Sequence, residues 1–253
     1  MDQATYYSRQ FRGSHFNADI NTYAMGRNDF IVKEIISRVF KGQSIRDAQV
    51  VELSIGGGDL TCGLLENIPD VNLTCVDIDP LRIEYVKKEI NRKYPMFLMK
   101  TEFLEINFDL QFDKLISAKY DVVIALDILE HVFDVFGFIE NCARLLKPGG
   151  VFFLRVPNIA YIKHRLGLLC GKMPVTASWF GTPNSIKEWK EKHGWDGGHL
   201  HFFTIPLLRQ LLHEYSFEVL SCKDPGASLS GLRNFWPTLF YGNPLLVARK
   251  PPK

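Results

Sequence analysis

The sequence predicts a doubly wound α/β fold built on one mostly parallel sheet. Three observations favour it: the chain has 253 residues, 46% of them are hydrophobic, and short apolar runs alternate with segments of helical periodicity. Alternation of strand and helix is typical of parallel sheets that carry helices on both faces. We therefore expect one domain over residues 1–253 rather than two separate cores.

Seven segments have the length and apolar character of strands. They are residues 50–55, 72–77, 97–101, 120–126, 151–156, 217–222 and 245–249. Residues 161–170, which show no clean period, are a candidate for a short helix, and helices are predicted over 28–40, 59–67, 80–94, 132–146 and 204–215. Asn28 and Thr204 are expected to cap the first and the last of these helices, because their side chains can accept a backbone N–H.

Charge and composition exclude several classes of protein. The chain has 30 basic and 28 acidic residues and a formal net charge of +2, so we expect a small-molecule partner and no nucleic acid. No apolar run approaches the roughly 20 residues of a membrane span. Residues 1–12 have no apolar signal segment, which favours a cytoplasmic protein. The five cysteines lie singly, without zinc-site spacing, so no metal site is expected.

The strongest motif is VVELSIGGGD at residues 50–59, in which an apolar strand runs into three glycines and then a helix. Glycine lets a backbone turn sharply and approach a ligand closely. Nineteen residues after Gly58, Asp77 ends the next strand, where its carboxylate can accept both hydroxyls of a ribose. Thr61 stands where a dinucleotide motif counted from Gly56 needs its third glycine. The motif thus favours a nucleotide-like ligand other than a dinucleotide; a tight structural turn is the alternative.

Glu52 to Gly58 resembles motif I of class I S-adenosylmethionine-dependent methyltransferases, with Ser54 where the first glycine usually stands. Further segments agree with this family in their order along the chain. They are Tyr120 to Val123, Leu129 to His131, Leu146 to Gly150, Val156 to Asn158, Gly198-His199 and Phe203-Thr204. Together they resemble the subgroup that includes the ubiquinone-biosynthesis O-methyltransferases, over about residues 45–222.

The resemblance implies a Rossmann-like sheet with an antiparallel last strand, S-adenosylmethionine as cofactor and S-adenosylhomocysteine as product. From the pattern along the chain we expect four parts: an N-terminal lid and helix (1–44), a cofactor-binding core (45–158), a substrate-side lid insertion (159–203), and a C-terminal helix and strands (204–253). The residues that the resemblance assigns to the cofactor are Glu52, Ser54, Gly56, Gly58, Asp77, Ile78, Glu102, Phe103 and Leu126.

Among these, Asp77 is expected to hold the ribose, and Glu102 and Phe103 to meet the adenine. A purely structural role for Glu52 and a solvated position for Glu102 are the alternatives. Glycines 56 and 58 are expected to let the backbone pass the methionine part.

His131 follows the fourth strand and is expected to act as a base on a hydroxyl acceptor, since imidazole titrates near neutral pH. Shaping of the pocket is its alternative role. His199 and His201 alternate along an extended segment and so face opposite sides, and His199 is expected to be the one in the site. Asp127, Trp179 and Trp195 are expected on the acceptor side.

The function predicted from these residues is methyl transfer to a small-molecule acceptor at a hydroxyl group. N-methylation and methylation of RNA or protein stay open as alternatives. From another class of function, a catalytically silent module that binds the cofactor and regulates a partner also stays open.

Overall fold

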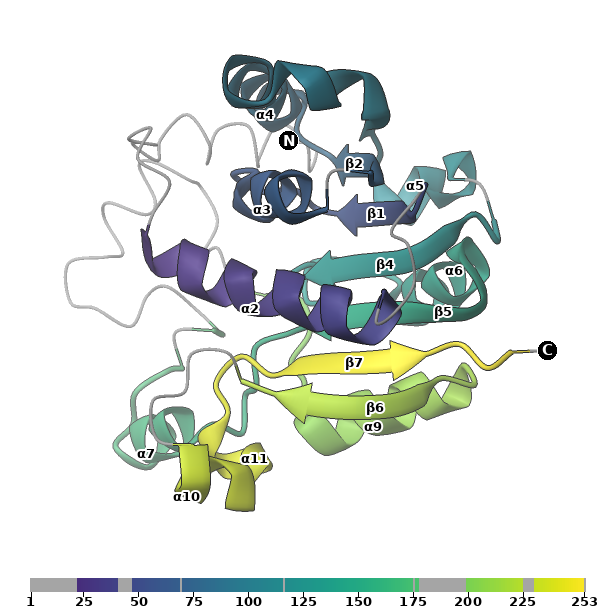
Figure 1. Ribbon diagram of the computed structural model, residues 1–253. Coiled ribbons are helices and arrows are strands. Elements are labelled where there is room, and N and C mark those ends of the chain that lie inside the picture. The colour runs from purple at the N-terminus through teal and green to yellow at the C-terminus, as the bar shows by residue number, and fades with distance from the viewer. Residues whose placement is uncertain are drawn as a thin grey trace.

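A computed structural model of the chain describes residues 22–40, 47–68, 70–115, 117–174, 176–177, 199–224 and 230–252. Its strands form one seven-stranded sheet in the order β3-β2-β1-β4-β5-β7-β6 (Figure 1). The strands are β1 (Gln49–Leu53), β2 (Asn72–Asp77), β3 (Thr101–Glu105), β4 (Tyr120–Leu126), β5 (Leu146–Arg155), β6 (Glu218–Lys223) and β7 (Leu245–Arg249). Neighbours pair in parallel except that β7 runs antiparallel to β5 and β6. The predicted doubly wound sheet with an antiparallel last strand is confirmed.

Helices cover both faces of this sheet (Figure 1). One face carries α2 (Thr22–Val39), α3 (Asp59–Asn67) and α4 (Pro80–Lys93). The other carries α5 (Phe108–Gln111), α6 (Val135–Leu145) and α9 (Ile205–Glu214). Shorter elements are η1 (Pro95–Lys100), η2 (Phe112–Lys114), α7 (Ile162–Leu169), α10 (Ser230–Phe235) and α11 (Pro237–Phe240). None of the helices in the described ranges has the length and apolar character to cross a membrane.

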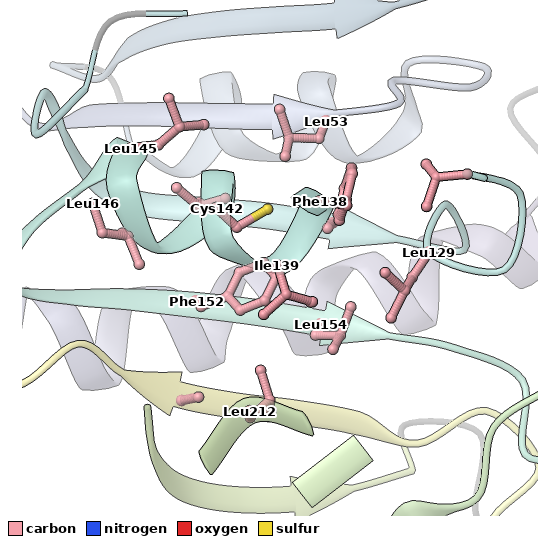
Figure 2. Packing of buried hydrophobic residues seen from close by; sticks show 14 of the residues in the cluster. Leu53, Leu129, Phe138, Ile139, Cys142, Leu145, Leu146, Phe152, Leu154 and Leu212 are labelled. Atoms are coloured by element: carbon pink, nitrogen blue, oxygen red, sulfur yellow. The ribbon is translucent and has the colours of Figure 1, made fainter. Parts of the chain in front are cut away.

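Strand periodicity divides the core into two layers, because successive side chains point to opposite faces of the sheet. In β5, Phe153 packs with the α2–α3–α4 layer, whereas Phe152 and Leu154 pack with the α6–α9 layer. Figure 2 shows Phe138, Ile139 and other side chains of α6 packed among residues of the second layer. This two-sided burial holds the carboxyl ends of the central strands in fixed relative positions.

Several boundaries differ from the prediction, and three of the differences concern helix caps or the site. Helix α2 begins at Thr22, so Asn28 lies inside the helix and is not its cap. Residues 97–101 were predicted as the third strand, but Pro95–Lys100 forms a 3-10 helix and the strand runs from Thr101 to Glu105. The apolar run misled because Met96 and Met99 are exposed, at 75% and 98%, and proline at the first turn starts a helix.

The third difference lies after β4, where helix α6 starts at Val135 because Asp134 caps it, its carboxylate accepting the Gly137 N–H at 2.8 Å. A helix had been predicted from residue 132, and the three residues before Val135 belong to a loop instead. The predicted cap Thr204 is confirmed, since its hydroxyl accepts the Leu207 N–H at the start of α9.

Candidate active site

The candidate site lies where the order of the strands reverses. The chain adds β2 and β3 on one side of β1, and β4 and β5 on the other. Loops from the carboxyl ends of β1 and β4 therefore diverge to opposite faces and leave a crevice between them, where ligands of open α/β sheets bind. Leu53, Asp77 and Leu126 are the last residues of β1, β2 and β4 and mark this edge.

The loop after β1 turns in left-handed conformations, with φ of 70° at Ser54, 54° at Gly56 and 83° at Gly58. Ser54 thus takes a backbone conformation that favours glycine, which accounts for the glycine that usually stands there in the resembling family. A Cβ on Gly58 would lie 2.8 Å from Cγ2 of Val86, whereas one on Gly56 would meet no atom within 4 Å. Gly58 is therefore required for packing against α4, and Gly56 faces open space.

Asp77 is buried at 4% exposure, and backbone N–H groups orient both of its carboxylate oxygens. Oδ2 accepts the N–H of Gly56 at 3.3 Å, and Oδ1 accepts that of Asp79 at 3.0 Å. Burial raises the pKa of this carboxyl, while Arg82 and the two N–H groups lower it. The carboxylate is thus fixed in position beside the glycine loop.

Two adjoining pockets surround these groups. The Asp77 pocket is lined by Ser54, Asp77, Ile78, Asn107, Phe108, Asp109, Ile128, His131 and Val132. The glycine-loop pocket, of about 280 Å³, is lined by Asn28, Glu52, Ser54, Ile55, Gly56, Gly57, Asp59, Leu60, Arg82, Leu126, Asp127 and Arg155. Ser54 lines both, so the two pockets meet at the first residue after β1.

Glu52 is a carboxyl group in the apolar layer beneath α3, at 4% exposure. Its Oε2 accepts the hydroxyl of Thr61 at 2.7 Å. Burial raises the pKa of Glu52 to about 8, against the lowering effect of that hydrogen bond, and Asp77 raises it further. At neutral pH the group is therefore largely protonated in the protein without ligand, and a cation in the pocket favours its ionised form.

The structure does not bring Glu102 and Phe103 into the Asp77 pocket. Glu102 pairs in register with Thr74, three residues before Asp77, and its exposed carboxylate lies 3.6 Å from Nζ of Lys119. The cause is the shifted strand, since β3 ends at Glu105 and not before Glu102. Asn107 and Phe108, just beyond its end, line the pocket instead. Placing the end of β3 correctly would have pointed to them.

Asp127 is locked by a bidentate ion pair with Arg155 at the end of β5. The Arg155 Nε lies 3.0 and 3.1 Å from the two carboxylate oxygens, and its Nη2 lies 2.5 Å from Oδ2. Asp127 has a left-handed φ of 53°, and its N–H donates to the carbonyl of Arg155 at 2.9 Å. Sequence reasoning missed Arg155, because a strand pattern does not show that the arginine at the end of β5 pairs with Asp127.

Beside the Asp77 pocket, the structure brings His199 against His131, with ring centroids 4.7 Å apart and planes at 90°. The N–H groups of Leu200 and His201 donate to the carbonyl of Glu130 at 2.9 and 3.3 Å, which ties the two segments together. Burial and then His199 lower the pKa of His131 to about 4, and burial lowers that of His199. Both imidazoles are therefore neutral at pH 7.

Donor atoms of Glu130, His131 and His199 all lie within 4.8 Å of one another, so this group can hold a metal ion. The sequence did not indicate it, because His199 is 68 positions from His131 and the spacing matches no metal-site pattern. Trp179 and Trp195, and residues 1–21 of the predicted N-terminal lid, lie outside the described residues.

Residues 51–152 match the family described as "Methyltransferase domain". Over these residues the chain matches a methyltransferase domain. It is 25% identical over 173 residues to a ubiquinone biosynthesis O-methyltransferase of Colwellia psychrerythraea, covering 63% of this chain and 66% of that protein. It is 22% identical over 162 residues to the mitochondrial enzyme of that name from Homo sapiens, covering 60% of this chain and 42% of that protein.

The domain also has the fold of the 1,6-didemethyltoxoflavin-N1-methyltransferase of Burkholderia thailandensis, solved with S-adenosylhomocysteine. The TM-score is 0.58 at 16% identity, over 99% of this chain and 92% of that one. The methyltransferase domain spans less than two thirds of the length of the two relatives above. These similarities establish the domain and its fold.

Proposed function

We propose that this methyltransferase domain transfers a methyl group from S-adenosylmethionine to a hydroxyl group of a small-molecule acceptor. The observation that carries the proposal is the pairing of a fixed, buried Asp77 with the open space above Gly56 at the strand reversal. Identity of 25% to an O-methyltransferase supports the choice of a hydroxyl acceptor.

We assign the two pockets to the two halves of this cofactor. Asp77 is placed to accept both ribose hydroxyls, and Ile78 and Phe108 offer apolar surface for the adenine beside it. Asn107 can pair with the polar edge of that ring. When bound, S-adenosylmethionine supplies a methyl group activated by a positively charged sulfur. Adenine recognition thus moves from Glu102 and Phe103 to the residues just after β3.

The glycine-loop pocket suits the methionine part, since Gly56 and Gly57 line it without side chains and Leu126 offers apolar surface. Glu52 lies below this loop, where its ionised form favours the amino group. In such a pocket the protein chiefly aligns the acceptor with the methyl group.

His131 lines the Asp77 pocket with a neutral imidazole, so it can hold or take the proton of an acceptor hydroxyl. His199 packs against it and is the second candidate. Asp127, Trp179 and Trp195 stay as proposed acceptor contacts, with Asp127 oriented by Arg155.

The test is a panel of hydroxyl and amine acceptors incubated with S-adenosylmethionine, followed by mass spectrometry. We expect a product heavier by one methyl group, with equimolar S-adenosylhomocysteine, and an O-linked methyl by fragmentation. An N-linked methyl would reassign the acceptor. Cofactor binding without turnover across the panel would favour a regulatory module instead.

A further inference from the structure

Arg155 brings a guanidinium group to the carboxyl end of β5, between the ends of β4 and β7. It pairs in register with Leu126 of β4 and with Leu245 of β7. Side chains alternate between the two faces of a strand, so Arg155 lies on the same face as Phe153, which packs with the α2–α3–α4 layer. The glycine loop leads into α3 on that face, and Arg155 lines the glycine-loop pocket.

Only part of this guanidinium is engaged. Its Nε and Nη2 donate to the carboxylate of Asp127, at distances of 2.5 to 3.1 Å. Nη1 is buried and has no hydrogen-bond partner among the residues that the structure describes, and the residue as a whole is 9% exposed. A buried N–H group of a cation costs free energy when it has no acceptor. Arg155 therefore has a pair of donors left for a ligand.

A second cation, Arg82, lines the same pocket but is placed differently. Its Nε lies 3.4 Å from Oδ2 of Asp79, the buried residue that caps α4. Arg82 also lowers the pKa of Asp77, so its charge acts on the β2 side of the pocket. Arg155 belongs to the β4–β5 side instead, together with Leu126.

We propose that Arg155 binds the carboxylate of the methionine part of S-adenosylmethionine through Nη1, and that it thereby selects this cofactor over its decarboxylated form. The inference rests on the proposed function, which assigns the glycine-loop pocket to the methionine part. Hydrogen bonds from a guanidinium to a carboxylate are shorter and stronger than those between neutral groups. Glu52 is assigned the amino group, so the two charged groups of the methionine part meet different side chains.

The ion pair with Asp127 prepares Arg155 for this contact. Two of its nitrogens hold the guanidinium, and the carbonyl of Arg155 accepts the Asp127 N–H at 2.9 Å. Because the side chain is already fixed, the binding of a further carboxylate costs little side-chain entropy. A ligand without the carboxylate leaves Nη1 buried and unpaired, and a site rejects such an analogue more strongly than an apolar pocket would.

Calorimetric titration of the full chain with two ligands tests the contact. One is S-adenosylhomocysteine, and the other is its decarboxylated form, an adenosine thioether that keeps the amino group and lacks only the carboxylate. The wild type should bind S-adenosylhomocysteine about 10- to 100-fold more tightly, the range for hydrogen bonds to charged groups. Arg155→Gln should bind both ligands with similar affinity, because its loss is confined to the ligand that has the carboxylate.

Lys147→Gln is the matched control. Lys147 is also a cation of β5 that pairs with an aspartate of β4, since its Nζ lies 2.8 and 2.9 Å from the carboxylate oxygens of Asp121, but it lines neither pocket. This variant should keep the wild-type preference. Arg155→Lys keeps a positive charge beside Asp127 and gives up the second pair of donors, so it should lose most of the preference. It provides the test where circular dichroism shows that Arg155→Gln does not fold.

Equal affinities of the wild type for the two ligands would overturn the inference and leave the proposed function intact, since the cofactor product still binds. A preference that persists undiminished in Arg155→Gln and Arg155→Lys would overturn it as well, and so would a loss in Lys147→Gln as large as theirs. If neither ligand binds the wild type, the proposed function fails, and this inference fails with it.

Discussion

Among single residues, Asp77 is the one whose substitution tests the proposed cofactor binding most directly. Asp77→Asn keeps the shape of the side chain but removes the charge that would accept the two ribose hydroxyls. We expect affinity for S-adenosylhomocysteine to fall by about 1.5–3 kcal/mol, the range for hydrogen bonds to a charged group. Isothermal titration calorimetry measures the change.

Glu105→Gln is the matched control for Asp77→Asn. Glu105 ends the neighbouring strand in register with Asp77, but its side chain is exposed and lines neither pocket. Its substitution should leave affinity unchanged. Equal affinities in all three proteins would place the ribose elsewhere.

Glu52 makes stability depend on pH. Its pKa is about 8 in the folded chain, against a model-compound value of 4.5. Between these values the folded state binds the proton and the unfolded state releases it, so unfolding becomes more favourable as pH rises. Relative to Glu52→Gln, the free energy of unfolding of the wild type should fall by up to about 1.4 kcal/mol per pH unit, and should level off above pH 8.

Urea unfolding of the ligand-free proteins from pH 5 to pH 9 measures the difference in free energy of unfolding between the wild type and Glu52→Gln. This range includes the folded-state pKa of Glu52, about 8. Glu84→Gln, an exposed carboxylate on α4, is the control and should track the wild type. Parallel curves for the wild type and Glu52→Gln would show that Glu52 ionises normally.

Among the structural elements, the loop between β1 and α3 contains one glycine that packs against α4, Gly58, and one that faces open space, Gly56. Substitutions at these two positions therefore test packing and ligand binding separately. Gly56→Ala adds a methyl in open space at a left-handed φ, and should cost about 1–2 kcal/mol of stability and lower cofactor affinity. Gly58→Ala adds contacts of 2.8 and 2.9 Å to Val86 as well, and should cost a further 1–3 kcal/mol or so.

Gly149→Ala is the control for backbone strain, because Gly149 has a φ of 81° with open space around its Cβ and lines neither pocket. It should lose stability as Gly56→Ala does and keep its cofactor affinity. Thermal unfolding together with calorimetry separates the two effects. A Gly56→Ala variant that binds as tightly as Gly149→Ala would remove the glycine loop from the site.

Sequence periodicity identified the elements better than their ends. Strands 72–77, 120–126 and 245–249 and helix 59–67 were placed as found, because burial on both faces or on one stripe leaves a regular apolar pattern. The third strand was misplaced because its apolar run includes an exposed residue, Met99, and Glu102 and Phe103 lie within the strand and do not line the Asp77 pocket. A pattern of apolar residues does not record which of them the tertiary structure buries.

The same distinction applies to the candidate site: some of its residues follow from the local sequence pattern, and others are brought together only by the tertiary structure. Gly56, Gly58 and Asp77 follow strands directly, so their positions at one edge of the sheet follow from topology. The contact of His131 with His199 depends on how two distant loops meet, which no local pattern encodes. Glu130 shows the same limit, since backbone N–H groups of the distant residues Leu200 and His201 donate to its carbonyl.

In the molecule as a whole, one sheet between two helical layers brings the buried Asp77 at the end of β2 beside the glycine loop that follows β1. The proposed function assigns an adenosine-containing cofactor to this arrangement. The sequence around Gly56 does not match a dinucleotide motif, so we expect the site to prefer S-adenosylmethionine to a nicotinamide dinucleotide.

Calorimetric titration of the full chain with S-adenosylhomocysteine, and in parallel with NADH, tests this claim most directly. We expect saturable one-to-one binding of S-adenosylhomocysteine, with a rise in melting temperature that grows with ligand concentration, and no binding of NADH. Binding of NADH with no response to S-adenosylhomocysteine would contradict it.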